Sequence, residues 1–255
     1  MNRSFRANRE IKKHIKGITR TDLDAPVLVT SVLLKVMAVL LAVMIPITTF
    51  GIASNIIFRT PDVYSFEFEK SGAVKQLGID STARELGVQV SNFMLHKQND
   101  VKYEIEYNNT SASAFSKIEI AQLKEIRISI DRILVMTIIT LALSVAFFVF
   151  ILRYEEYKYL KYAFRGSIVV FLLIVAFIMI FISSAGVHDK IFEMILDASQ
   201  NAKSMLPLIF GDSYKLIASL LIGGISLLLY VVIYAIAKRF FRENKMFEID
   251  NLGTD

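Results

Sequence analysis

The chain has 255 residues, of which 54% are hydrophobic and 21% charged, with a formal net charge of +5. Soluble domains average about 45–50% apolar and about 25% charged residues, so this composition favours a membrane protein. The sequence contains no cysteine, which excludes disulfides, a cysteine nucleophile and cysteine-ligated metal sites on this chain.

Four long apolar stretches carry most of the hydrophobic residues. They lie at 36–58, 133–152, 167–187 and 216–237, and each is close to the ~20 residues with which a helix crosses the hydrocarbon core. The sequence therefore predicts an all-α membrane protein with a bundle of four transmembrane helices.

The charges indicate which side of the membrane each connecting segment occupies. Taken together, segments 1–35, 153–166 and 238–255 carry more Lys and Arg than acidic residues, whereas 59–132 and 188–215 carry slightly more acidic residues. The positive-inside rule places the basic segments, and with them both termini, in the cytoplasm of a multi-pass plasma-membrane protein. Topology and attraction to anionic lipid then account for the net positive charge, and we expect no nucleic-acid partner.

Residues 59–132, called the cap here, form a long extracytoplasmic segment. Within it, 63–69 and 101–107 alternate apolar and polar side chains with a period of two, which predicts two strands that could pair. Between them, Thr82 and Glu85 fit a capping box that opens a helix. The sequence therefore predicts a small mixed α/β cap. The apolar residues of its helix are Leu86, Val90 and Phe93.

A second capping box, Ser116 with Glu119, opens a helix that is expected to continue into the second span. Glu119, Gln122 and Glu125 follow one another at intervals of three, so they should share part of one helix face just above the membrane. They are candidate site residues. The alternative interpretation is an ordinary solvated helix face.

Segment 188–215 is amphipathic and should lie along the membrane interface. His188 stands where the third span leaves the hydrocarbon. An ionisable residue at that depth is a functional candidate, since imidazole transfers protons near neutral pH. The alternative interpretation is a polar anchor.

The other two histidines carry less weight. His14 lies in the basic tail. His96 ends the cap helix, where the helix dipole favours a cation. No two histidines have the spacing of metal ligands, and we expect no metal or cofactor.

Several functional classes lack support in the sequence. It contains no nucleotide-binding glycine motif, no zinc-protease motif and no G-x-S-x-G motif. A transporter or channel is disfavoured because the spans lack buried charges. The Gly223–Gly224 pair in the fourth span is interpreted as a site of close helix packing.

The order of these parts resembles the lipoprotein intramolecular transacylase (Lit) family of bacterial membrane proteins. Before its second span the family has a pattern like F-x-x-x-E-x-x-H-x-x-D-V-K, which 115–127 matches in spacing. After the third span it has a His followed by apolar and aromatic residues, as in 188–192, and then a P-x-x-F-x-D pattern, as in 207–212. Tyr64, Leu77, Gly78 and Leu86 also stand where the family has similar residues.

The resemblance implies a four-helix bundle with an extracytoplasmic cap and a transfer reaction within a diacylglyceryl lipoprotein. The acyl chain would move from the glyceryl sn-2 oxygen to the amine of the N-terminal cysteine at the outer leaflet, giving the lyso form without a cofactor. The partners would be membrane phospholipid and the lipoprotein. His188 would be the base, oriented by Glu119 or Glu125.

One residue departs from the family pattern. The first of two motif histidines is replaced by Gln122, which can donate a hydrogen bond to an oxyanion but is no base at neutral pH. Two interpretations stay open: a divergent transacylase that works through His188, or an inactive homologue that binds lipid or lipoprotein.

Overall fold

The computed structural model describes residues 20–72, 74, 82–101, 104–107, 110–113, 115–154, 156–183 and 209–250. Segments 188–208 and 1–19, with His188 and His14, lie outside these residues. The elements in chain order are α2 (Arg20–Ile57), α3 (Pro61–Lys70), α5 (Ala83–Met94), β1 (Glu104–Tyr107), β2 (Thr110–Ser113), α6 (Lys117–Arg153), α7 (Tyr157–Ser183) and α10 (Asp212–Asp250).

The described part of the chain has four helices that are long and apolar enough to cross a membrane. They cover Ser31–Ile57, Lys117–Arg153, Tyr157–Ile180 and Ser213–Arg239. Each overlaps one span predicted from the sequence, so the chain is a helical, multi-pass membrane protein.

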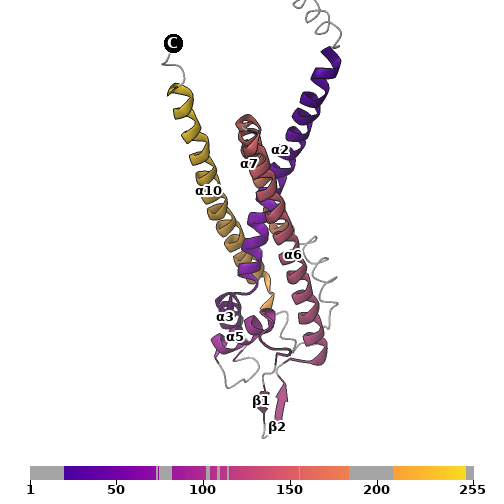
Figure 1. Ribbon diagram of the computed structural model, residues 1–255. Coiled ribbons are helices and arrows are strands. Elements are labelled where there is room, and N and C mark those ends of the chain that lie inside the picture. Colours follow the sequence, from indigo (N-terminus) through magenta and orange to yellow (C-terminus); the bar gives the residue numbers. More distant parts are fainter. Residues whose placement is uncertain are drawn as a thin grey trace, which may run out of the picture.

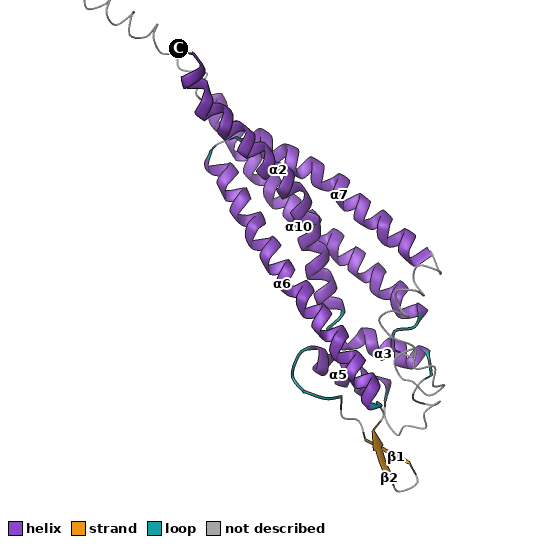
Figure 2. Cartoon of the chain, turned by 90° about the vertical axis from the view of Figure 1, so that its right-hand side faces the viewer, coloured by secondary structure: helices purple, strands orange, loops and turns teal. Residues whose placement is uncertain are grey.

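The four long helices, called the bundle here, are α2, α6, α7 and α10. Helix α2 packs against the other three, which contact one another much less. The cap lies at one end of the bundle, whereas α2 begins and α10 ends at the opposite end (Figure 1, Figure 2). Helix α6 joins the two regions because it begins in the cap and ends in the bundle.

The strand predicted at 63–69 is wrong, because these residues form helix α3. Pro61 occupies the first helical position and Asp62 the first turn, and both residues favour a helix start. The buried side chains are Val63, Tyr64, Glu67 and Phe68. These positions recur with the spacing of one helix face. Burial of that face against the rest of the cap therefore decides the structure of this segment, although its residue types alternate as in a strand.

The predicted pairing between 63–69 and 101–107 is therefore wrong as well. Among the described residues of the second segment, Glu104–Tyr107 form a strand, β1, which pairs antiparallel with β2. This hairpin projects from the far end of the cap (Figure 2). The predicted mixed α/β cap is replaced by packed helices with a hairpin at their edge.

Both predicted capping boxes are confirmed. The Thr82 hydroxyl accepts from the Glu85 amide and the Glu85 carboxylate from the Thr82 amide, at 3.2 Å each. Ser116 and Glu119 form the same reciprocal pair at the start of α6. Helix α6 then runs without a break into the second span, as predicted.

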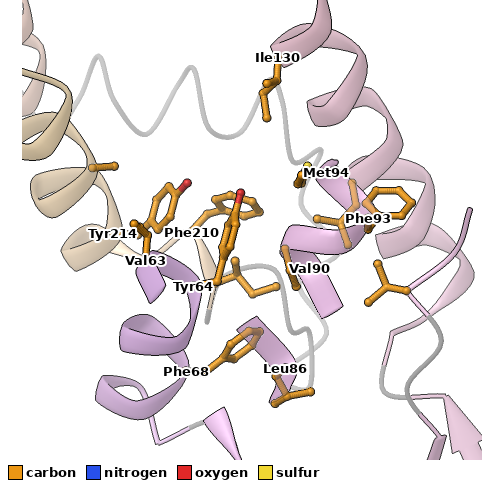
Figure 3. Close-up of a cluster of buried hydrophobic side chains, with 14 of the residues drawn as sticks. Val63, Tyr64, Phe68, Leu86, Val90, Phe93, Met94, Ile130, Phe210 and Tyr214 are labelled. Carbon is orange, nitrogen blue, oxygen red and sulfur yellow. The ribbon is translucent and has the colours of Figure 1, made fainter. Parts of the chain in front are cut away.

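The core of the cap is aromatic. Tyr64 stacks on Tyr214 of α10, with ring centroids 5.8 Å apart, and Phe210 meets Tyr64 edge-on at 6.3 Å (Figure 3). The predicted apolar stripe of α5 is confirmed, because its three residues, Leu86, Val90 and Phe93, are fully buried. At Gly87 a Cβ atom would lie 2.6 Å from the Ser65 amide nitrogen, so α3 and α5 pack backbone to backbone there.

The interpretation of Gly223–Gly224 as a close-packing site is wrong. No atom lies within 4 Å of a Cβ built at either residue. Both glycines instead border an open apolar groove between α7 and α10, of about 360 Å³. The close helix contact is elsewhere, at Gly51 of α2, where a Cβ atom would collide with the Thr137 side chain of α6.

Candidate functional site

The three predicted residues of α6 differ in burial. Glu119 is buried and its carboxylate accepts the Ser116 amide at 2.8 Å. Gln122 is half-buried, and Glu125 is exposed. Residues three apart on a helix point in directions that differ by about 60°. The successive side chains of Glu119, Gln122 and Glu125 therefore turn from the cap interior to the surface. Glu119 thus caps the helix, and Gln122 is the motif residue placed between interior and surface.

The motif after the third span is described only in its last part. Phe210 lies in the cap core against Tyr64 and Tyr214. Tyr64 and Phe210 are two of the residues that carry the resemblance to the Lit family. They come from distant parts of the sequence, and the fold places them in contact. The position of His188 relative to Gln122 lies outside the described residues and stays a prediction.

A second constellation lies where the cap meets the bundle. The Asp131 carboxylate of α6 accepts from Arg59 Nη2 at 2.7 Å through Oδ1 and pairs with His96 Nε2 at 2.8 Å through Oδ2. We call these three residues the Asp131 cluster. The Arg59 side chain is 17% exposed and that of His96 55% exposed. The cluster therefore has a fixed inner ion pair and an imidazole that reaches the surface.

The turn that carries Arg59 is held by hydrogen bonds from the cap. The Tyr64 hydroxyl donates to the Phe58 carbonyl at 2.5 Å, and the Ser91 hydroxyl donates to the Arg59 carbonyl at 2.6 Å. These bonds satisfy carbonyls that the end of α2 leaves without helical partners. Burial raises the pKa of Tyr64 above its usual value, so its hydroxyl stays protonated and continues to donate.

Helix α5 positions the imidazole from the other side. Arg127 of α6 lies 4.2 Å from the centre of the Phe93 ring and donates to the Phe93 carbonyl at 3.2 Å. Such a cation–π contact combined with a hydrogen bond fixes the end of α5 on α6. His96 follows that end directly, so its ring is held over Asp131.

The Asp131 cluster and Gln122 are separate sites. Nine residues on α6 separate Gln122 from Asp131, which corresponds to about 14 Å along the axis and half a turn around it. The two side chains therefore leave α6 in opposite directions at different heights. A small group bound at one of these two sites is therefore remote from the other.

An apolar groove of about 440 Å³ lies between α2, α6 and α7. This size is within the range of small-ligand sites. Arg132 and Ser54 line it, whereas the three residues of the Asp131 cluster do not. The groove is lined by Ile47, Phe50, Gly51, Ser54, Arg132, Ile133, Met136, Thr137 and Ile174. Met136 is 64% exposed and Ile47 43% exposed, so the groove opens toward the lipid.

No group of three or more His, Asp or Glu side chains suited to a metal ion occurs among the described residues. One further acidic group is buried in the cap. The residue Glu67 is 3% exposed, its Oε1 has no hydrogen-bond partner, and burial raises its pKa. It lies near the aromatic core rather than beside the Asp131 cluster.

The sequence did not single out the Asp131 cluster. Asp131 is 72 residues from Arg59 and 35 from His96, and the packing of α2 and of the end of α5 on α6 brings them together. One signal was present, because Asp131 and Arg132 are the last charged residues before the apolar run of the second span. Charges at that depth usually have partners.

Comparison with solved structures gives a consistent answer for the fold. Two histidine-substituted variants of the membrane integral lipoprotein intramolecular transacylase Lit from Bacillus cereus match with a TM-score of 0.65 at 12% identity, over 87% of this chain and 98–99% of theirs. The fold is Lit-like. A third Lit structure from Bacillus cereus matches with a TM-score of 0.61 at 11% identity, over 85% of this chain and 99% of the other.

The similarity to Lit is one of structure. No protein-family model and no curated protein matches the sequence. The match covers nearly the whole of each Lit chain, so it includes both bundle and cap. The resemblance predicted from weak motifs is confirmed at the level of the fold.

Proposed function

We propose that this chain catalyses a Lit-like intramolecular acyl transfer on diacylglyceryl lipoproteins at the outer leaflet. The observation that carries the proposal is the Lit-like fold over 87% of the chain. The open apolar groove beside polar side chains at the cap boundary adds support, since the reaction needs acyl chains in the bilayer next to an amine at its surface. Donor and acceptor belong to one molecule, so holding them together supplies much of the rate.

The sequence motifs assign roles to four residues. His188 is the base that takes the proton of the substrate ammonium, and Gln122 donates a hydrogen bond to the oxyanion. Glu119 or Glu125 orients His188. Glu119 also accepts the Ser116 amide through Oε2 as part of its capping box.

The proposed topology places the cap outside the cell and both termini in the cytoplasm. The absence of cysteine allows a direct test, because any introduced thiol is unique. With Lys97→Cys in the cap, a membrane-impermeant maleimide should label intact cells. With Tyr162→Cys at the other end of the bundle, labelling should require permeabilised cells. The reverse pattern would exclude the topology.

The alternative function is that of an inactive homologue that binds lipid or lipoprotein. The replacement of a motif histidine by Gln122 favours it, because loss of a general base costs roughly 10²–10⁴-fold in rate. The groove supports either function equally.

The test is mass spectrometry of the N-terminal peptide of a reporter lipoprotein, in cells that lack other N-acylating enzymes. An N-acyl, S-monoacylglyceryl peptide is expected with the wild-type chain and not with an empty vector. His188→Ala should remove the product if His188 is the base, and Gln122→His should increase it if the replacement limits the rate. A diacylglyceryl peptide with a free amine, from well-expressed wild type, would support the binding function instead.

A further inference from the structure

Helix α7 has an apolar groove on each of two faces. The first groove, between α2, α6 and α7, has a volume of about 440 Å³, and the second, between α7 and α10, has a volume of about 360 Å³. Phe50 of α2 borders both grooves. They form because α7 packs on α2 and contacts α6 and α10 much less. On α7 itself, Ile174 lines the first groove, and the residues that line the second point about 100° away from it.

Both grooves lie in the half of the bundle next to the cap. The first covers the last turns of α2, up to Ser54, and the second covers early turns of α10, from Ser219 onward. Met136 on the first groove is 64% exposed and Leu220 on the second is 60% exposed. Each groove is therefore open to the lipid, and a ligand can enter either one from the bilayer.

Two neighbouring apolar grooves fit a molecule that has two acyl chains. Each groove has a size within the range of small-ligand sites, and its lining is almost entirely apolar. A helix with its side chains is about 10 Å wide, so two chains that leave one glyceryl group can pass on the two sides of α7. The glyceryl group would then lie above the outer end of α7, at Ser183.

The surroundings favour a lipoprotein over a membrane phospholipid as the source of these chains. The first groove lies on the Gln122 side of α6, because Ile133 and Met136 point within about 20° and about 40° of Gln122. In the sequence, His188 follows the end of α7 by five residues. The two motif residues with proposed roles in the transfer thus belong to segments next to the grooves. A phospholipid offers no cysteine amine for that reaction.

We propose that the two grooves hold the two acyl chains of a diacylglyceryl lipoprotein, the transferred sn-2 chain in the first groove and the retained sn-1 chain in the second. The inference rests on the proposed function and specifies how its substrate binds. The first groove takes the sn-2 chain because the carbonyl of that chain reacts on the Gln122 side.

Both chains can stay in their grooves during the transfer. The C–O bond from the sn-2 carbonyl carbon to the glyceryl oxygen breaks, and the C–N bond to the cysteine amine forms. One proton of the neutral amine passes to the glyceryl oxygen, so that an amide and a free hydroxyl result. The grooves would hold the reacting carbonyl in place while its partner changes from oxygen to nitrogen, which is catalysis by positioning.

The first test is photo-crosslinking of the purified full chain in phosphatidylglycerol–phosphatidylethanolamine vesicles. Two synthetic diacylglyceryl lipopeptides carry a diazirine, one in the sn-2 chain and one in the sn-1 chain, and mass spectrometry locates the labelled residues. The sn-2 probe should label α6 around Met136, and the sn-1 probe should label α10 around Gly223. A phosphatidylglycerol with the same diazirine chain should label both places much less. Equal labelling by this phospholipid would overturn the inference.

The second test fills each groove by substitution. Gly223→Leu should fold, because no atom lies within 4 Å of a Cβ at Gly223 and leucine favours a helix more than glycine does. Met136→Trp narrows the first groove. With a dipalmitoyl lipopeptide, each should raise KM by roughly three- to tenfold at unchanged kcat, since a chain that leaves a groove for lipid loses only packing contacts. Val135→Trp is the matched control with unchanged KM, because Val135 is 55% exposed and does not line either groove.

Shortened chains identify which groove holds which chain. A substrate with butyryl at sn-1 should no longer respond to Gly223→Leu, whereas it should still respond to Met136→Trp. A substrate with butyryl at sn-2 should show the opposite dependence. A reversed pattern, or one that ignores the position of the short chain, would overturn the assignment.

The outcomes separate this inference from the proposed function. Transfer by wild type, with labelling that does not depend on the position of the diazirine, would overturn the inference and leave the proposed function intact. Position-specific labelling of a folded wild-type chain without transfer would support the binding mode and overturn the proposed function in favour of the inactive homologue. The absence of both would overturn both.

Discussion

Two phenylalanines show how differently the cap and the bundle are built. Phe93 in the cap is fully buried between α5 and α6, whereas Phe177 on α7 is 70% exposed. The cap encloses its apolar side chains in a core of its own, while α6, α7 and α10 present theirs to the lipid and meet one another only sparsely. The cap therefore packs its side chains closely, whereas the bundle leaves apolar grooves open on its surface.

The Asp131 cluster lies at the boundary between these two regions. Arg59 follows the first span, Asp131 precedes the apolar run of the second, and His96 comes from the end of α5. The ions are paired there because a charge near the hydrocarbon is costly without a partner. The contrast between a rigid cap and an open bundle therefore explains why the polar groups collect at their junction, and the following substitutions test that contrast.

The largest difference in the free energy of unfolding is expected between alanine substitutions at two glycines, one in the cap and one in the bundle. Gly87→Ala inserts a methyl group 2.6 Å from the Ser65 amide nitrogen and 2.8 Å from the Pro61 carbonyl oxygen, and should lower the free energy of unfolding by about 2–3 kcal/mol. Gly223→Ala meets open space and should gain up to about 1 kcal/mol from helix propensity. SDS titration in mixed micelles, followed by circular dichroism, measures both. Similar values at the two sites would mean that the cap is no better packed than the bundle.

The Arg59–Asp131 ion pair is expected to be the next strongest contribution. A double-mutant cycle with Arg59→Gln and Asp131→Asn should give a coupling free energy of about 2 kcal/mol, because the pair is a short hydrogen bond between charged, mostly buried groups. The matched cycle uses Asp100→Asn and Lys124→Gln, which are 3.9 Å apart and about half exposed. Its coupling should stay below about 0.5 kcal/mol. Equal couplings would contradict a special role for the junction.

The start of α6 provides a smaller effect. Ser116→Ala should cost about 1 kcal/mol because it removes the N-cap acceptor of the Glu119 amide. Glu119→Gln keeps an acceptor for the Ser116 amide and should cost less than about 0.5 kcal/mol. Unfolding by SDS measures stability, and the reporter lipoprotein measures transfer. If Glu119→Gln abolishes transfer at unchanged stability, then Glu119 has a role in the reaction beyond helix capping.

The smallest expected effect depends on pH. Burial raises the pKa of Glu67, so the folded protein holds its proton more tightly than the unfolded chain does. The free energy of unfolding contributed by Glu67 is therefore full below about pH 4 and declines as the pH rises through the raised value. Glu67→Gln should match the wild type in acid and exceed it at neutral pH by up to about 1 kcal/mol. An unchanged difference across the range would exclude the burial effect.

The sequence was sufficient for features that depend on local order. The four spans follow from the length of apolar runs, and both capping boxes from residues three apart. The strand at 63–69 was wrong because alternation of residue types cannot distinguish a strand from a helix that buries Tyr64 and Phe68 with helical spacing. Pro61 followed by Asp62 was the local signal that favoured the helix.

The candidate site was less accessible to prediction. His96 was interpreted as a helix-end cation, and its partner Asp131 is 35 residues away. No local pattern connects them, because the contact depends on the turn after α5 and on Phe93 packing against Arg127. The open groove depends likewise on how far the long helices diverge, which the apolar character of their residues does not encode.

The most direct test of the account is an experimental structure of the chain with a bound diacylglyceryl lipopeptide. The account predicts one acyl chain in the groove along Phe50, Met136 and Ile174, with its ester carbonyl on the Gln122 side of α6. An acyl chain outside this groove, with the ester and the amine remote from Gln122, would contradict it.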